Sequence, residues 1–421
     1  MNRNIVFGTL GVGLLLILMA MVSQQEAASV DSLKSDRQSY DVANQTTPTH
    51  ISQLASASNR FGFNLFAQIN NELSQENIVI SPSSIAIALA MTGNGTEGKT
   101  REELTTALKL PELDYRAINR SYQKLIETLK TADPDVKLAI ANSLWVNREI
   151  TLKDRFVNRA KEFYQARVSS LDFANFKTKS TIDSWVAKNT ANKITEVVDS
   201  VSSQDALYLI NAIYFKGIWT NKFDANATIE KPFYTNGNSQ PQPMMSQTGD
   251  YRYYQSNGFQ AVRLPYGEKE ELGMYIFLPS EASSLAEFNQ QLNIDNWQEW
   301  IGQMRSQKGN ITIPRFELEY ETDLVKSLSQ LGINQIFNSS QADFSAMTDT
   351  PVAIDRVKHK TFIEVNEEGT EAAAVTSIGI RITSAQPQDP AFAMNVNRPF
   401  FFAIRDDITE TILFMGNVVE P

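Results

Sequence analysis

The chain of 421 residues has no cysteine and only two histidines, and both shortages exclude kinds of chemistry. Without cysteine there is no disulfide, no thiol nucleophile and no thiolate metal site. His50 lies in a polar N-terminal stretch, so a Ser-His-Asp hydrolase would depend on His359 alone. The GxSxG and HExxH motifs of hydrolases and zinc proteases are missing too, and we expect no phosphate-binding glycine loop. We therefore expect no enzyme activity, no metal and no other cofactor.

Acidic residues outnumber basic residues by 48 to 38, which gives a formal net charge of −10. Such a charge keeps a protein soluble and argues against nucleic acid as a partner. Residues 59–421 contain no internal repeat and no linker-like stretch, and 42% of the chain is hydrophobic. These features predict one large domain with a sizeable core, most simply as a monomer.

The N-terminus predicts export. Arg3 precedes an apolar run from Ile5 to Val22, and a positive residue before such a run favours translocation of the chain beyond it. A cleavage site is poorly marked, because Gln25 and Glu26 stand where small residues are wanted. The run is therefore either a signal peptide or an uncleaved membrane anchor.

The predicted domain plan has three parts. Residues 1–23 form the signal peptide or anchor, and residues 24–57, which have few large apolar side chains, form a flexible tether. Residues 58–421 form the folded domain. That domain would be extracellular or periplasmic, either released or held by the anchor.

Local patterns predict several elements of the folded domain. Ser81 and Pro82 mark a helix start, and the IAIALAM run after them predicts a buried helix. Leu207–Phe215 and Gly273–Leu278 are apolar and rich in strand formers, which indicates interior strands, and residues 322–332 predict a helix that ends at its glycine. An amphipathic first helix is predicted by one apolar face, formed by Phe61, Leu65, Phe66, Ile69 and Leu73.

The most unusual stretch is residues 367–384, EEGTEAAAVTSIGIRITS. From Thr370 onward its even-numbered positions are small or apolar, whereas several odd positions are polar, as in a half-buried strand. Three successive alanines are weak strand formers, but small side chains suit a segment that slides between existing strands. Two alternatives stay open from the pattern alone: an ordinary surface strand with an alanine patch, or a segment with an exposed and an inserted state.

Other segments of the chain, together with this stretch, carry a resemblance to a known family. They are NIVISPSSIAIALAMTGNGTEGKTREEL (77–104), ANSLWV (141–146), WVAKNTANKITEVV (185–198), LYLINAIYFKGIWTNKF (207–223), AVRLPYGEKEELGMYIFLP (261–279), ITIPRFELEYETDLVKSLSQLGI (311–333), ADFSAMT (342–348) and FMGNVVEP (414–421). In this order, from about Asn59 to Pro421, the chain resembles the serpins. The resemblance implies an α+β serpin fold with three β-sheets, eight or nine helices and an exposed reactive loop at about 367–397.

The resemblance also implies a function, that of a bacterial-type inhibitory serpin. A serine protease would attack the exposed loop and form an ester intermediate with it. The cut segment, residues 370–383, would then enter the main sheet as a new central strand and carry the linked protease along. A non-inhibitory serpin that acts as a carrier or chaperone is the alternative.

The family's loop pattern places the reactive bond between Thr383 and Ser384, which suits an elastase-like or subtilisin-like protease. A cut between Arg381 and Ile382 is the alternative and would suit a trypsin-like protease. The hinge that enters the sheet first has no proline and no bulky residue. It comprises Glu367, Gly369, Thr370, Glu371, Ala372, Ala373 and Ala374.

Further residues match family positions that control the opening of the sheet. Trp219 matches a tryptophan at the top of the sheet, and Arg315 matches the partner of Glu367 in a charge pair beside the loop. If exposed, that pair would contribute under about 1 kcal/mol. A polar cluster beneath the opening is expected from Ser81, Ser84, Asn211 and His359.

A basic stripe recurs on a predicted helix at Arg116, Arg120 and Lys124. In some serpins a stripe on the corresponding helix binds sulfated polysaccharide. On an acidic chain, three such charges more often form a solvated face. We therefore do not expect a polyanion partner.

Overall fold

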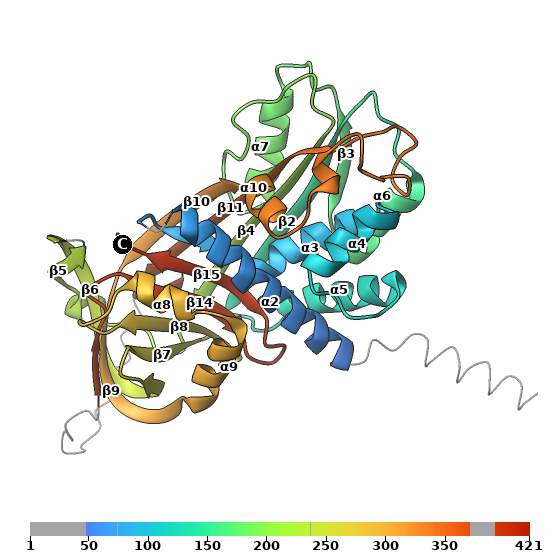
Figure 1. The fold of residues 1–421 in the computed structure, drawn as a ribbon. Coiled ribbons are helices and arrows are strands. Elements are labelled where there is room, and N and C mark those ends of the chain that lie inside the picture. The colour runs from blue at the N-terminus through green and yellow to red at the C-terminus, as the bar shows by residue number, and fades with distance from the viewer. Residues whose placement is uncertain (1–47, 74, 236, 371–391) are drawn as a thin grey trace, which may run out of the picture. The chain divides into compact units, whose positions relative to one another are not determined.

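The computed structural model describes residues 48–421, apart from positions 74, 236 and 371–391 (Figure 1). The predicted export segment 1–23 and the predicted tether up to residue 47 lie outside the described residues, as does most of the predicted reactive loop. Within the described ranges, no helix is long and apolar enough to cross a membrane.

Nine α-helices and two short 3-10 helices lie in the described residues, in agreement with the eight or nine helices expected. The 3-10 helices are Ala225–Ala227 and Gln335–Phe337. The α-helices are α2 (Pro48–Glu72), α3 (Pro82–Gly93), α4 (Gly98–Ala107), α5 (Tyr115–Lys130), α6 (Asp154–Tyr164), α7 (Thr178–Asn189), α8 (Leu285–Gln291), α9 (Ile294–Gln303) and α10 (Val325–Gln330).

The strands form two hydrogen-bonded sheets. The six-stranded sheet has the order β10 (Phe316–Asp323), β11 (Ile354–Asn366), β12 (Gly369–Thr370), β4 (Leu207–Ile218), β2 (Val136–Asn147) and β3 (Arg167–Leu171). The nine-stranded sheet has the order β1 (Ile78–Ile80), β15 (Ile412–Val418), β14 (Phe400–Asp406), β8 (Leu272–Pro279), β7 (Phe259–Tyr266), β6 (Asn238–Gln255), β9 (Arg305–Pro314) and β13 (Phe392–Asn395), with β5 (Ile229–Thr235) on β6.

The expected α+β architecture is confirmed, although three sheets were expected and two continuous ones are found. The reason is the 18-residue strand β6. It pairs with β7 over Arg252–Gln255 and with β9 over Met244–Tyr253, so it links two sets of strands that would otherwise form separate sheets. Because both ladders run along the same strand, their hydrogen bonds join into one network.

Strand β4 is buried on both of its faces, as its apolar run predicts. Leu209, Ile213 and Phe215 pack into the main core, whereas Tyr208 and Ile210 pack into a smaller cluster with residues of α7. Successive side chains of a strand point to opposite faces, so a strand covered on both sides must be apolar throughout. The other predicted interior strand, Gly273–Leu278, is confirmed as part of β8.

Helix α3 begins where the sequence predicts. Ser81 is its N-cap and its hydroxyl accepts a hydrogen bond from the Ser84 amide, while Pro82 takes the first turn. Every residue of α3 is buried. The helix therefore fills the space between β4 and β15 and lies against α2 (Figure 1).

The predicted tether is wrong over residues 48–57. These residues belong to α2, which begins at Pro48, and the side chains of Leu54 and Ala55 are fully buried. Their small and polar neighbours hid this helix from a composition argument. The apolar face predicted downstream is confirmed, since Phe61 and Leu65 are also fully buried.

Two further boundaries differ from expectation. The helix predicted over 322–332 is shorter, because β10 runs to Asp323 and leaves only α10 before Gly332, whose φ of 92° ends it. The reactive loop was expected to extend to residue 397. It ends earlier, because β13 begins at Phe392 and pairs in parallel with β9. The Phe392 ring stacks on Tyr253 at 3.7 Å and holds this strand in place.

Two helical glycines should respond in opposite ways to alanine. A Cβ on Gly62 of α2 would lie 2.3 Å from Cβ of Pro82, so Gly62→Ala should push α2 from α3 and cost about 1–3 kcal/mol. A Cβ on Gly302 of α9 meets nothing within 4 Å, so Gly302→Ala should be neutral or gain up to about 1 kcal/mol from helix propensity. Thermal denaturation of both variants tests the packing, and equal melting temperatures would contradict it.

Candidate functional site

In the six-stranded sheet, β4 and β11 pair directly along most of their shared edge, which we call the seam. At one end of the seam another strand separates them. Strands β4 and β11 pair in parallel, from Leu207 with Ile354 to Tyr214 with Phe362. Beyond that point β12 lies between them. Gly369 and Thr370 pair with Ile218 and Gly217 on one side and with Asn366 and Val365 on the other, antiparallel to both. Two hinge residues therefore already separate the two strands.

Gly369 occupies a position that only glycine fits. Its φ of 149° is rare for residues with a side chain, and an added Cβ would lie 2.0 Å from the carbonyl oxygen of Gly217. The turn from β11 into β12 therefore depends on this residue.

Thr370 is fully buried at the end of the seam. Its hydroxyl lies 2.6 Å from the hydroxyl of Tyr266, and burial raises the pKa of that tyrosine, so Tyr266 stays a neutral partner. The Tyr266 ring stacks on Trp219 at 4.3 Å, and the indole Nε1 of Trp219 donates to the carbonyl of Asn366 at 2.9 Å. Trp219 thus lies at the top of the seam, as predicted, and supports both β11 and the residue that holds Thr370.

The turn before β12 is fixed by Glu367. Its carboxylate accepts hydrogen bonds from Nε of Arg315 at 2.7 and 2.8 Å and from the hydroxyl of Thr228. Only 8% of the Glu367 side chain is exposed. Burial by itself would raise the pKa of Glu367, but the hydrogen bonds from Arg315 and Thr228 outweigh it and hold the pKa below the ordinary value.

The predicted charge pair between Arg315 and Glu367 is therefore present. Its carboxylate half is buried although Arg315 remains exposed, so removing Arg315 would take from a buried carboxylate its charged partner. Main-chain bonds pin the same turn, since the amides of Trp219 and Phe223 donate to the carbonyls of Glu368 and Glu367 at 2.9 and 3.0 Å.

The predicted polar cluster lies on the seam below β12. His359 on β11 and Asn211 on β4 are register partners, and Nδ1 of His359 lies 2.7 Å from Oδ1 of Asn211. Nε2 of His359 accepts from the Ser81 amide at 3.1 Å, so the ring proton must be on Nδ1. The Asn211 amide group donates to Ser84 and to Oδ1 of Asn142. The structure thus brings together all four predicted residues.

Complete burial lowers the pKa of His359 from its ordinary value of 6.5 to about 3, although the hydrogen bond with Asn211 acts in the opposite sense. The imidazole is therefore neutral near pH 7. Protonation would place an N–H against the Ser81 amide, which is itself a donor. The bond of His359 to Asn211 across the seam and its bond to the Ser81 amide can therefore coexist only while the ring stays neutral.

Three residues of the site were missed from the sequence. Asn142 stands out as a polar residue in an apolar strand, and that signal could have been used. Tyr266 and Thr228 reach the site only because β7 and the chain before β5 fold against it, so no local pattern marks them. The basic stripe lies on α5, where Arg116 is exposed and Lys124 pairs with Glu127 at 3.9 Å.

Several predicted site residues lie outside the described residues. They are the rest of the hinge and both candidate reactive bonds: Glu371, Ala372, Ala373, Ala374, Arg381, Ile382, Thr383 and Ser384.

The chain does contain one match to the GxxxxGK[ST] spacing of phosphate-binding loops, at residues 93–100. The expectation that there is none was wrong for the sequence. A phosphate loop connects a strand to a helix, whereas this segment connects α3 to α4. Thr96 within it is buried and its hydroxyl donates to the carbonyl of Gly93. The match therefore lacks the context that would bind phosphate.

Comparison with known proteins gives a consistent result. The sequence profile described as "Serpin (serine protease inhibitor)" matches residues 56–421. Human Serpin B8 is 35% identical over 382 residues, which cover 88% of this chain and 100% of that protein. A serpin-like protein of Thermococcus kodakarensis is 34% identical over 387 residues, 91% of this chain and 88% of the relative.

Solved structures agree. The crystal structure of human thyroxine-binding globulin with thyroxine superimposes with a TM-score of 0.81 at 26% identity, covering 88% of this chain and 99% of the other. The native state of tengpin, a thermophilic serpin, gives a TM-score of 0.78 at 29% identity over 87% of this chain and 94% of the other.

The buried histidine predicts a pH dependence of stability. Between about pH 6.5 and pH 4.5 only the unfolded chain takes up a proton at this site, because the folded pKa of about 3 lies below the unfolded value. Above about pH 6.5 the ring is neutral in both states and does not affect the free energy of unfolding, which should fall by up to about 1.4 kcal/mol for each pH unit below that value. Thermal denaturation of the wild type and His359→Gln across this range measures the effect.

The matched control is His50→Gln, which removes the other histidine of the chain, at the start of α2. It should retain the wild-type pH dependence, and His359→Gln should flatten it. An equally steep decline in His359→Gln would show that other groups cause it.

Proposed function

Because the chain belongs to the serpin family, we propose that it inhibits serine proteases as a suicide substrate, by insertion of its cleaved loop into the six-stranded sheet. The observation that carries this proposal is β12. Its two residues are antiparallel to both neighbours and buried at the mouth of the seam, which is the geometry that a complete inserted strand would need. A cut beyond them would free the following chain to extend β12.

The register of β12 defines the path of that extension. Thr370 pairs with Gly217 and Val365, so continuing the antiparallel register by six residues brings Thr376 between Asn211 and His359. Both neighbours give the same answer, because Asn211 and His359 are themselves partners. The side chain of Thr376 would also point to the same face of the sheet as that of Thr370, since the two residues are an even number of positions apart. Its hydroxyl could then replace the hydrogen bond that joins Asn211 to His359 in the closed seam.

The free energy available to this step is large. Pairing of about a dozen residues at roughly 1 kcal/mol each, with burial of three isoleucines at about 1.5–3 kcal/mol each, gives on the order of 10–20 kcal/mol. This is comparable to the free energy of unfolding of a typical domain, about 5–15 kcal/mol. Insertion at about 3.3 Å per residue would move the ester-linked protease by tens of ångströms and could distort its active site.

The target is proposed to be an elastase-like or subtilisin-like protease that cuts between Thr383 and Ser384, with Arg381 and a trypsin-like protease as the alternative. The apolar run after Arg3 supports export of the folded domain, released or anchored.

A carrier function is a second candidate, supported by the likeness to thyroxine-binding globulin in complex with thyroxine. Such a carrier would not need to form a covalent complex.

Thr370→Arg should convert the inhibitor into a plain substrate. The arginine would have to be buried without a partner beside Tyr266, so β12 could not stay seated and the cut chain would not extend it. Incubation with an elastase-like protease, followed by a denaturing gel, should show a covalent complex for the wild type and only cleaved chain for the variant.

Thr370→Ser keeps a small side chain with a hydroxyl and should still form the complex. A covalent complex of undiminished yield with Thr370→Arg would contradict insertion as the trapping step. A wild type that is cleaved without a complex by elastase-like, subtilisin-like and trypsin-like proteases would favour the carrier function.

The reactive bond can be located directly. Mass spectrometry of the C-terminal peptide released from the complex should give the mass of residues 384–421 if the protease cuts after Thr383. A peptide that begins at Ile382 would assign the bond to Arg381 and the target to the trypsin-like class. A cut before residue 376 would leave too short a segment to reach His359 and would contradict the proposed register.

A further inference from the structure

A side chain joins β4 and β11 at the far end of the seam, which is the end opposite to β12. Asp355 lies where the register of β11 with β4 shifts, between Ile354 and Arg356. One oxygen of its carboxylate, Oδ2, accepts from the amides of Ala206 and Leu207 at 2.6 and 3.0 Å. Leu207 is the first residue of β4. The amides at the start of β4 are therefore satisfied by a side chain of β11 instead of its main chain.

The inserting strand of the proposed function would reach this end of the seam last. Continuing the antiparallel register of β12 from Thr370, which lies opposite Gly217, brings Ile380 opposite Leu207. The Leu207 amide already faces the edge of β4 that the inserted strand would line, because it donates to a residue of β11. A regular antiparallel neighbour satisfies each such amide with a main-chain carbonyl. A fully inserted strand and the Asp355 carboxylate would therefore compete for the same amide.

The surroundings of Asp355 make these bonds exchangeable. Burial raises the pKa of Asp355, the hydrogen bonds from the amides of Leu207 and Ala206 only partly oppose this rise, and the like charge of Asp205 adds to it. The carboxylate is thus less stable as an anion here than in water. A main-chain carbonyl that took its place would bring no charge to be desolvated, so the exchange would cost little.

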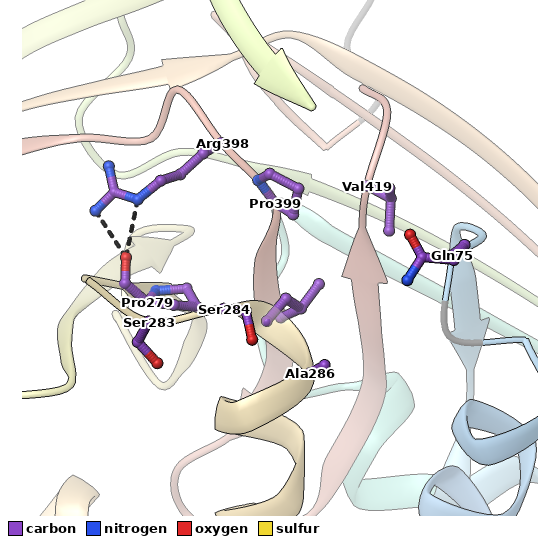
Figure 2. Close-up of a pocket in the computed structure, with 9 residues that line it drawn as sticks. Gln75, Pro279, Ser283, Ser284, Ala286, Arg398, Pro399 and Val419 are labelled. Atoms are coloured by element: carbon purple, nitrogen blue, oxygen red, sulfur yellow. Dashed lines mark hydrogen bonds between the residues drawn. The ribbon is translucent and has the colours of Figure 1, made fainter. Parts of the chain in front are cut away.

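Another strand end of this chain is held by a side chain without such competition. Strand β8 ends at Pro279, whose carbonyl accepts from Nε and Nη2 of Arg398 at 2.9 and 2.7 Å (Figure 2). The neighbours of β8 are β7 and β14. Neither of those pairings would open under the proposed function, so the bonds of Arg398 would persist. The bonds of Asp355 differ because they lie on the edge that opens.

We propose that Asp355 is a positioning residue that joins the far end of the seam in the intact chain and gives up its two amides when the inserted strand arrives. This inference rests on the proposed function, because the competing strand exists only if the cleaved loop inserts. Release of Asp355 is then the last step of insertion. Without it the strand would stop one pair short, with Arg356 as its last partner on β11.

Asp355→Ala should weaken the intact chain and leave the cleaved chain unchanged. In guanidinium chloride the intact variant should unfold at a midpoint about 0.2–0.5 M below that of the wild type, because two charge-assisted hydrogen bonds are lost. After cleavage of the loop beyond Ile380, verified by mass spectrometry, variant and wild type should unfold at the same midpoint. In that form the Leu207 amide has a main-chain partner, so the carboxylate no longer contributes. Equal losses in both forms, or no loss in the intact form, would overturn the proposal.

Two further variants separate this role from a general loss of stability. Asp355→Asn should keep most of the intact midpoint, since both bonds end on one oxygen and an amide oxygen can accept them too. The matched control is Glu103→Ala, because Oε2 of Glu103 accepts from the amides of Asn334 and Gln335 at 2.8 Å each, and none of these residues belongs to the seam. It should lower both forms alike. A loss confined to the intact form in this control as well would overturn the proposal.

The same measurement distinguishes failure of this inference from failure of the proposed function. If the wild type gains no resistance to guanidinium chloride on cleavage, the loop does not insert, and the proposed function fails together with this inference. If the wild type gains resistance but Asp355→Ala lowers both forms equally, only the role of Asp355 is refuted.

Discussion

An interior strand of a β-sheet needs a hydrogen-bonding partner along each edge, and the six-stranded sheet meets this requirement in two ways along one seam. Strands β4 and β11 satisfy each other over most of their length, in parallel. At one end they are satisfied by β12 instead, in antiparallel register. The same two edges therefore accept two different partners, and the arrangement of every residue at the candidate site follows from the boundary between these pairings.

The side chains at that boundary are of two kinds. Apolar residues of β4 are buried on both faces of the sheet, and their side chains form no hydrogen bond across the seam. The polar residues differ, since His359 and Asn211 bond to each other only where the seam is closed. A few neutral hydrogen bonds, each contributing about 1 kcal/mol, can hold such a seam without making it permanent.

Sequence patterns were sufficient where local chemistry decides the structure. The Ser81 cap, the buried run of α3 and the two-sided burial of β4 all depend on neighbours in the chain. The patterns failed where distant residues decide. Residues 48–57 look like a linker, yet Leu54 and Ala55 are buried against the fold. Likewise, no property of Tyr266 predicts that its hydroxyl meets Thr370, because that contact joins the two sheets. The family resemblance predicted the polar cluster, whereas the pairing of β12 between β4 and β11 was seen only in the structure.

The seating of β12 also bears on speed. Forming a new strand from a free segment ordinarily begins with a costly nucleation, in which a loop must close before any pairing rewards it. Here the nucleus exists already, since two residues are paired on both sides and Glu367 anchors the turn behind them. Under the proposed function, β12 would lengthen one residue pair after another from this fixed end, without a lag for nucleation. The rate of insertion would be set by how quickly β11 separates from β4, and hardly at all by the length of the loop segment that inserts.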